Sequence, residues 1–278
     1  MPTPRRRLKA PKAEKTLRAI GPNEGIRLAY QRKLERLIDE MEASVLYWIR
    51  AAYRANPPAL AQDDTAAQAM KRAMRQLIAR WLDRFEEGAQ KLAAYFSQSV
   101  SQRSDAVLKK ILKDAGFSID WRMTPAQREI IQATVEQNVA LIKSIPQQCL
   151  GRVEVIVMQS VQNGRGLHEV VEELQKQFHV TKKRAKFIAT DQNSKAMAAL
   201  NRARYLELGL QEAVWMHSGG GKHPRPTHVK AGRDKVRFNI AEGWHDPDPK
   251  VDKKIQPGEL INCRCQCRAI VPAFERRA

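Results

Sequence analysis

The stretch TKKRAKFIATDQNSKAMAALNRARYLELGL, residues 181–210, lies at the boundary between two kinds of sequence. It is typical of one long helix, which Thr181 can cap at its start and Gly209 can end. After Gly209 the chain becomes rich in glycine, proline, histidine and tryptophan. The predicted fold class is therefore mainly α, a long helical N-terminal body followed by a small α+β module of short strands at 211–278. The β-like runs of this module are 213–217, 235–239 and 260–271.

The sequence before this stretch has helical periodicity as well. From Asn23 onward, apolar residues recur at spacings of three and four until Asn56-Pro57-Pro58 ends the pattern. A second helix is predicted to begin at 63–65 and to run towards Leu112, ending at Gly116. The apolar stripes of these two helices are expected to pack against each other as an antiparallel pair.

A further helix start is visible at Thr124-Pro125-Ala126-Gln127, which combines a capping box with proline at the first helical position. We expect this helix to stop before Pro146. Another apolar stretch ends at Asn163-Gly164, and a short amphipathic helix follows from Leu167 to Phe178. Four regions are thus predicted: a basic flexible tail at 1–22, a helical region at 23–122, a second helical region at 123–210 and the His/Cys-containing module at 211–278.

The composition predicts a globular chain with a strong positive charge. Of 278 residues 43% are apolar, and 49 Lys and Arg against 30 Asp and Glu give a formal net charge of +19. This bias favours nucleic acid, an acidic membrane or an acidic protein as partner, without choosing among them. No apolar run approaches a membrane-spanning length and no apolar signal segment follows the basic start, so we expect an intracellular protein with reduced thiols.

The first residues are the part of the chain best suited to bind DNA phosphates. Residues 1–20 are rich in Lys, Arg and Pro and have little apolar surface to bury, so they are expected to stay mobile until an acidic partner orders them. The candidate nucleic-acid-binding residues are Arg5, Arg6, Arg7, Lys9 and Lys12. Contacts of this kind carry no sequence preference, and no recognition helix or stacking motif is apparent.

Three cysteines at every second position suggest a site near the C-terminal end. In an extended strand Cys263, Cys265 and Cys267 would share one face. Zinc takes four Cys or His ligands, and a small module with little core gains most folding stability from such a cross-link. Two thiolates of the strand with His223 and His228 would supply a set of four. The histidines of this region are His217, His223, His228 and His245.

Other roles for the same residues remain open. The cysteines can be small buried apolar residues, which is what free cysteines usually are. A zinc hydrolase would add an acidic general base, for which Glu242, Asp246 or Glu259 is available, and a Cys–His nucleophile pair is also conceivable. Neither enzyme has a recognisable local signature here, and neither C-x-x-C nor H-x-x-x-H spacing occurs among these residues.

Several segments in this order resemble a known family. They are NVALIKSIP (138–146), VQNGRGLHEVVEELQKQFHVTKKRAKFIATDQNSKAMAALNRARYLELGL (161–210), VWMHS, RPTHVKAGR and PGELINCRCQCRAIVP (257–272). In order and spacing they resemble the phage Mu F-like minor head proteins, also called phage head morphogenesis proteins, over roughly residues 125–272. The residues that carry the resemblance are Asn138, Pro146, Gly164, Arg184, Asp191, Gly209, Arg225, Asn262 and Arg264.

The resemblance implies a structural virion protein that acts near the portal during head assembly and has no established enzymatic activity. Many relatives have Cys-x-x-Cys in place of the Arg-Pro-Thr-His turn and a histidine ahead of the last strand, a set that looks like a zinc site. In this chain Arg225 replaces the first of those cysteines, His228 the second, and Glu259 or Leu260 the histidine. Cys263, Cys265 and His228 remain as matched positions, with His223 and Cys267 as local substitutes.

The functional expectation is a non-enzymatic minor head protein that bridges the portal, the major capsid or scaffold protein and packaged double-stranded DNA, located inside the capsid or at the portal vertex, and in the host cytoplasm during assembly. Zinc is a possible cofactor, and a membrane partner is not expected. An alternative from another class is a metal-dependent DNA-processing or toxin-like enzyme that uses the C-terminal His/Cys module. A general basic DNA-binding protein of the host is a third hypothesis.

Overall fold

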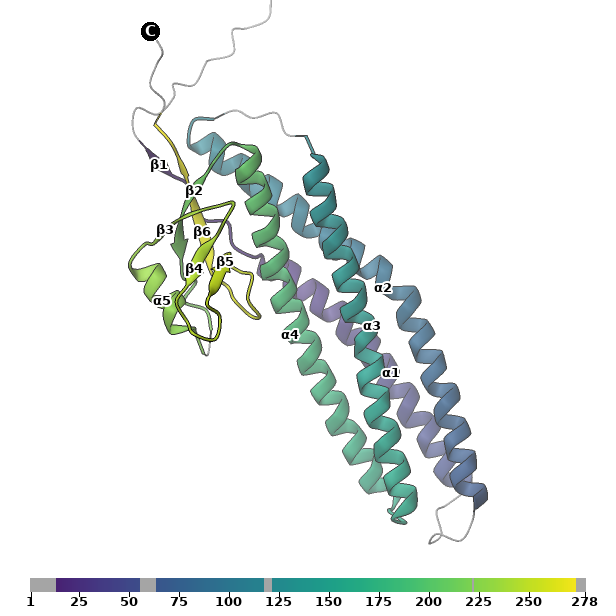
Figure 1. Cartoon of the computed structure of the whole chain (residues 1–278). Coiled ribbons are helices and arrows are strands. Elements are labelled where there is room, and N and C mark those ends of the chain that lie inside the picture. Colours follow the sequence, from purple (N-terminus) through teal and green to yellow (C-terminus); the bar gives the residue numbers. More distant parts are fainter. Residues whose placement is uncertain (1–13, 56–63, 118–121, 222, 274–278) are drawn as a thin grey trace, which may run out of the picture. The chain divides into compact units, whose positions relative to one another are not determined.

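Four long helices and a small set of strands make up the computed structural model over residues 14–55, 64–117, 122–221 and 223–273, which are the residues it describes (Figure 1). The mainly α fold class is confirmed, with short antiparallel strands near the C-terminus. In that part of the chain, no helix combines the length and the apolar character needed to cross a membrane. The long helices are α1 (Glu24–Ala55), α2 (Asp64–Asp114), α3 (Pro125–Gln162) and α4 (Leu167–Glu207).

Helices α1 and α2 form as the periodicity predicts. Asn23 caps α1, because its Oδ1 accepts a hydrogen bond from the backbone N–H three residues on, at 3.0 Å. The antiparallel packing of the two helices is confirmed by their contacts. Trp81 Nε1 donates to Ser44 Oγ at 3.1 Å, and Arg84 pairs with Glu40 at 3.4 Å, so that later positions of α2 meet earlier positions of α1.

The prediction that a helix stops before Pro146 is wrong, because α3 continues through this residue. Proline removes the helical donor for the carbonyl four residues earlier and disfavours a helix interior. Tertiary packing outweighs this cost: Ile142 and Ile145 are buried on the same helix. In addition, Arg184 of α4 donates to the carbonyl of Ser144 at 3.1 Å and to its Oγ at 2.9 Å, next to the proline.

The predicted break at Thr181 is also wrong, because α4 is one continuous helix on both sides of it. Thr181 is buried and its Oγ1 donates to the carbonyl of Gln177 at 3.0 Å, a bond within the helix instead of a cap. The end of α4 is as predicted. Gly209 has φ +71°, and the N–H of Leu210 closes the helix on the carbonyl of Tyr205 at 2.9 Å.

The chain divides into two compact units, each of which contains segments distant in sequence. One, called here the helical unit, consists of residues 27–96 and 135–189. The other, called here the mixed unit, consists of residues 1–26, 97–134 and 190–278. The candidate metal ligands all belong to the mixed unit.

The mixed unit contains a four-stranded antiparallel sheet in the order β1, β6, β2, β3, with the yellow β6 between β1 and β2 (Figure 1). The prediction of a strand over 260–271 needs correction, because β6 begins only at Gln266 and Cys263 and Cys265 precede it. The strands of this sheet are β1 (Lys15–Thr16), β2 (Glu212–Met216), β3 (Arg237–Asn239) and β6 (Gln266–Val271). A separate pair is formed by β4 (Trp244–Asp246) and β5 (Lys253–Ile255), and one short helix is α5 (Pro226–Arg233).

Residues 14–22 belong to the mixed unit and do not form a flexible tail, which corrects the prediction for that part. Strand β1 pairs with Ile270 and Val271 of β6. Leu17 and Ile20 are buried, and Arg268 Nε donates to the carbonyl of Leu17 at 3.2 Å. Pairing with β6 and burial of two apolar side chains together hold this segment in place despite its basic sequence. Residues 1–13, with Arg5, Arg6, Arg7, Lys9 and Lys12, lie outside the described residues.

Candidate metal centre

His228 is presented by the short helix α5 and is almost fully buried, with 2% of its side chain exposed. Pro226 starts this helix at a position that tolerates the missing N–H. The ring of His228 lies edge-on to Trp215 and Trp244, with ring centroids 5.1 and 6.1 Å apart. These two large rings close off the histidine from water and restrict the orientation of its imidazole.

A tight turn before β6 presents Cys263 and Cys265. Gly258 has φ +86°, and a Cβ at this position would lie 2.8 Å from Cβ of Ala198 in α4. Asn262 has φ +56°, which is tolerated by asparagine better than by most residues. The turn therefore approaches α4 more closely than a side chain at 258 would allow.

Two side chains fix the same turn through hydrogen bonds with its backbone: one accepts from an N–H group and the other donates to a carbonyl group. Asp191 of α4 accepts a hydrogen bond from the N–H of Asn262 at 2.7 Å through Oδ1, while its Oδ2 pairs with Lys195 at 2.7 Å. Arg225, just before α5, donates to the carbonyl of Ile261 at 3.1 Å. Three residues that carry the family resemblance, Asp191, Arg225 and Asn262, thus position the backbone that leads to Cys263.

The side chains of His228, Cys263 and Cys265 meet in one buried cluster. One ligand atom from each lies within 4.8 Å of the others. His228 Nδ1 is 3.5 Å from Sγ of Cys263 and 3.6 Å from Sγ of Cys265. On the other side of the ring, Nε2 is 3.0 Å from Oδ2 of Asp246, a fully buried carboxylate whose Oδ1 accepts from the N–H of Asp248 at 3.1 Å.

The electrostatics of the cluster favour a thiolate at Cys263. Its hydrogen bond with Cys265 lowers the pKa of Cys263 most; burial opposes this, and hydrogen bonds from His228 and the backbone of Gly258 lower the pKa further. The same pairing raises the pKa of Cys265, with burial adding to the rise. For His228, burial lowers the pKa, but hydrogen bonds and charges of Cys263 and Asp246 outweigh it and the pKa is raised.

The donor set fits zinc. Thiolate sulfur and imidazole nitrogen are the ligands that structural zinc takes, and two cysteines with one histidine supply three of its four positions. A carboxylate on the outer nitrogen is the usual partner of a metal-binding histidine, because it fixes the tautomer and makes the ring a better donor. Asp246 lies in that place, with Nδ1 left to face the two sulfurs. His228, Cys263 and Cys265 can therefore hold the metal and Asp246 can orient the histidine.

The other predicted ligands lie elsewhere in the described chain. His223 is exposed and is not part of the group of three. Cys267 lies in β6 opposite Trp215 and lines a different space. Of the proposed general bases, Asp246 is used by His228, while Glu242 pairs with Lys254 and Glu259 accepts from the N–H of Gln256. The sequence alone suggests Asp246 only as a general base, because nothing local signals that it faces a histidine.

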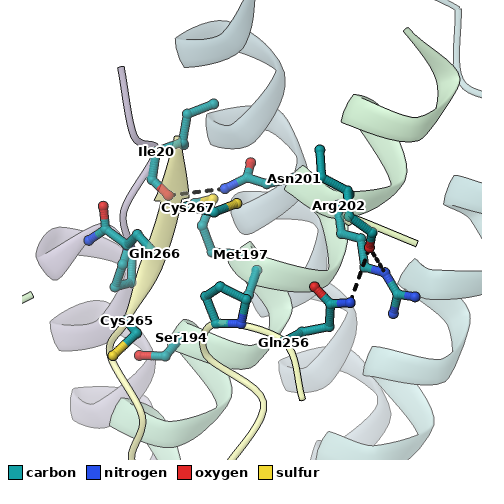
Figure 2. A pocket seen from close by; sticks show the side chains of 13 residues that line it. Ile20, Ser194, Met197, Asn201, Arg202, Gln256, Cys265, Gln266 and Cys267 are labelled. Carbon is teal, nitrogen blue, oxygen red and sulfur yellow. Dashed lines mark hydrogen bonds between the residues drawn. The ribbon is translucent and has the colours of Figure 1, made fainter. Parts of the chain in front are cut away.

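Cys265 and Cys267 line one side of a small cavity, and Ser194 and Met197 of α4 line the other (Figure 2). The cavity measures about 30 Å³, which is about the space of one water molecule. Burial raises the pKa of Cys267 to about 12, so its thiol stays protonated at neutral pH. This space has the size of a packing void and is too small for an organic substrate.

The remaining residues of the resemblance have structural positions. Asn138 is buried in the helical unit and accepts a hydrogen bond from the Tyr30 hydroxyl at 2.8 Å. Gly164 follows α3 with φ +62°, as a helix end requires. Arg264 is exposed, and its guanidinium lies beside Gly220. Pro146 and Arg184 lie in α3 and α4, and Gly209 follows the end of α4 as described above.

Comparison with known proteins identifies a family that resembles part of this chain. Residues 152–268 match the family model described as Phage Mu protein F like protein. This chain carries a Phage Mu F-like region. The predicted family is confirmed over this range, which includes the second part of α3, all of α4, α5 and the complete His228, Cys263 and Cys265 cluster.

A second comparison gives a distant relative. An uncharacterized protein of Haemophilus influenzae is 30% identical over 185 residues, which make up 66% of this chain. The chain spans 39% of the length of that protein. No solved structure matches the chain.

Proposed function

We propose that this chain is a phage minor head protein that acts in head morphogenesis without catalysing a reaction, bridging the portal, the capsid shell or scaffold, and packaged DNA. The match of residues 152–268 to the Mu F-like family carries this proposal. The geometry is consistent with a structural role: the His/Cys cluster is buried, and the nearby acidic side chains are paired.

A test of the head assembly role begins with the portal of the same phage. Co-expressed portal protein and this chain are expected to purify together at low salt, and heads assembled from portal, shell protein and this chain are expected to package DNA. Heads assembled without this chain should package less. Normal packaging in its absence would contradict the proposal, as would zinc- or magnesium-dependent plasmid cleavage that disappears in His228→Ala, since that would favour an enzyme.

DNA contact is proposed for the basic N-terminal residues. The net charge of +19 attracts a polyanion, and binding through phosphate contacts weakens steeply as salt rises, because each neutralised phosphate releases about 0.9 counterions. Deleting residues 1–13, which removes Arg5, Arg6, Arg7, Lys9 and Lys12, should reduce DNA retention and flatten its salt dependence without lowering the Tm.

The structure supplies a sharp control for that deletion. Removal of residues 1–20 also takes away β1, Leu17 and Ile20, so we expect this longer deletion to lower the Tm as well. Equal DNA retention by the full chain and the 1–13 deletion across a salt titration would remove the role assigned to the tail.

We further propose that His228, Cys263 and Cys265 hold a zinc ion and that Asp246 orients the histidine; the described residues supply three of the four ligands of a closed site. When bound, zinc supplies a cross-link between α5 and the turn before β6, two elements otherwise joined by a small core. The protein's own residues bring three ligands together, keep water out with Trp215 and Trp244, and hold one histidine nitrogen away from the sulfurs.

The zinc proposal is tested by metal analysis of protein purified without a histidine tag. One zinc ion per chain is expected, with loss of the metal and a lower Tm in Cys263→Ser. Cys149→Ala is the matched control, because Cys149 is an equally buried cysteine in the helical unit and its loss should leave the zinc in place. Metal-free protein with an unchanged Tm after chelation would refute the proposal.

A further inference from the structure

The helical unit carries an apolar groove between α1 and α2, far in sequence from the metal centre. The groove measures about 290 Å³, which is room for one or two large side chains. We call it the aromatic groove, and its lining residues are Trp48, Ala73, Gln76, Leu77 and Arg80.

An exposed aromatic side chain, Trp48, lines this groove, and a second, Tyr47, contacts its ring. Tyr47 is 65% exposed and Trp48 is 46% exposed, and their rings meet edge to face with centroids 5.4 Å apart. By contrast, Trp81 and Phe85, slightly further along α2, are buried in the core of the same unit. Tryptophan, tyrosine and arginine are the residues that most often dominate the energy of protein interfaces. An exposed pair of this kind beside a groove indicates a binding surface.

The stretches of α1 and α2 that contain the lining residues carry charges of one sign. From residue 43 to residue 55 of α1 and from residue 65 to residue 82 of α2, every charged side chain is a cation. None of these cations forms an ion pair within the part of the chain that the structure describes. The cations are Arg50, Arg54, Lys71, Arg72, Arg75 and Arg80.

Some other basic side chains of the same unit have acidic partners. Lys182 pairs with Asp39 at 2.7 Å and Glu42 at 2.8 Å, and Lys143 pairs with Glu86 at 2.6 Å. Arg80 lines the groove itself and forms no ion pair among the described residues. A partner that covers this surface must supply carboxylates to match the cations and an apolar side chain to fill the groove.

We propose that the aromatic groove binds an acidic amphipathic segment of another protein, which inserts a bulky apolar side chain between Trp48 and Leu77 and places its carboxylates against Arg80 and the neighbouring cations. Duplex DNA would satisfy the cations but has nothing to fill an apolar groove, because its outer surface is phosphate and sugar. An anionic lipid surface satisfies the cations and takes up exposed rings, but it offers no side chain of defined shape to fill the groove. The apolar floor thus favours a protein partner among polyanionic ligands.

The test uses a designed peptide helix of about 18 residues with Leu and Phe on one face and Glu on the other, and a copy with Lys in place of Glu. Fluorescence anisotropy with the full chain is expected to show salt-sensitive binding of the acidic peptide only. Trp48→Ala and Arg80→Glu should each weaken it at least about tenfold. The matched controls are Tyr95→Ala and Arg36→Glu, an exposed aromatic and an exposed cation that do not line the groove, and they should leave binding unchanged.

Competition separates the possible ligands. Absence of binding by the acidic peptide, or binding that ignores both Trp48→Ala and Arg80→Glu, would overturn the proposal. So would a 30-base-pair DNA duplex or vesicles of anionic lipid that bind through the same two residues and displace the peptide. A second experiment uses peptides tiled over the portal and shell proteins, and this experiment rests on the proposed head assembly function. If these fail while the designed peptide binds, the groove assignment stands and the head assembly role loses support.

Discussion

Gly258 is the residue at which a single methyl group should reveal how the metal centre is built. In Gly258→Ala the alanine would have to adopt a backbone φ of +86°. Its Cβ would also lie 2.8 Å from Cβ of Ala198 and 3.4 Å from the carbonyl oxygen of Ser194. Alanine in the left-handed region costs about 1–2 kcal/mol, and an extra carbon in a packed contact costs about 1–3 kcal/mol more. We therefore expect a loss of about 2–5 kcal/mol of unfolding free energy.

Gly219→Ala provides the matched control. Gly219 also has a positive φ, +70°, but a Cβ there meets nothing within 4 Å, so only the backbone cost of about 1–2 kcal/mol applies. The difference between the two variants, about 1–3 kcal/mol, isolates the close approach of the turn to α4. Because this turn carries Cys263, Gly258→Ala should also weaken zinc binding, whereas Gly219→Ala should not.

The assay is urea unfolding of both variants with and without zinc, together with zinc competition against a chelating dye. A larger loss of stability in Gly258→Ala and a selective loss of zinc affinity would support the reasoning. Equal destabilisation by the two substitutions would show that the turn does not need to lie against α4, and unchanged zinc affinity in Gly258→Ala would show that the position of Cys263 does not depend on it.

Two other substitutions test separate parts of the molecule. Asp246→Asn removes the charge that orients His228 and should lower zinc affinity about 10–100-fold, while the exposed Asp234→Asn should not change it; a chelator titration that finds equal affinities would contradict the role of Asp246. Lys182→Met removes the pairs with Asp39 and Glu42, whose hydrogen bonds raise the pKa of Lys182, and should cost about 1 kcal/mol. A raised pKa stabilises the fold while the lysine is protonated. The deficit of Lys182→Met should therefore be complete below about pH 10 and should disappear as the pH rises through the folded pKa. Urea midpoints at about pH 8 and about pH 11 that differ from wild type by the same amount would refute this.

A zinc ion at this site would link segments from the two ends of the described mixed unit. Strand β1, from the start of the chain, pairs with β6 directly after the cysteines, and Gln266 of β6 lies against Gly21. Metal binding at Cys263 and Cys265 would thus stabilise a sheet that includes residues 15 and 16. This explains why a tail deletion must stop before β1 if it is to report on DNA alone.

The candidate site was only half predictable. Cysteine and histidine chemistry singled out Cys263, Cys265 and His228, because few other roles bring these residue types together. His223 was an equally good ligand by composition, and nothing local distinguished it from His228. Helix α5 decides between them by burying His228 and leaving His223 exposed. Asp246 became recognisable as the histidine's partner only when β4 brought it across from residue 228.

By itself the sequence determined the helical character, the ends of α1 and α4 and the resemblance of residues 152–268 to the Mu F-like family, because these depend on local periodicity, caps, glycine and residue order. Tertiary structure decided that α3 continues through Pro146, that α4 continues through Thr181, and that residues 14–22 join the sheet. In each case burial of apolar surface against distant segments outweighs a local preference of a few kcal/mol at most. The metal centre belongs to the same class, because its ligands and their orienting carboxylate are assembled by contacts that sequence spacing does not record.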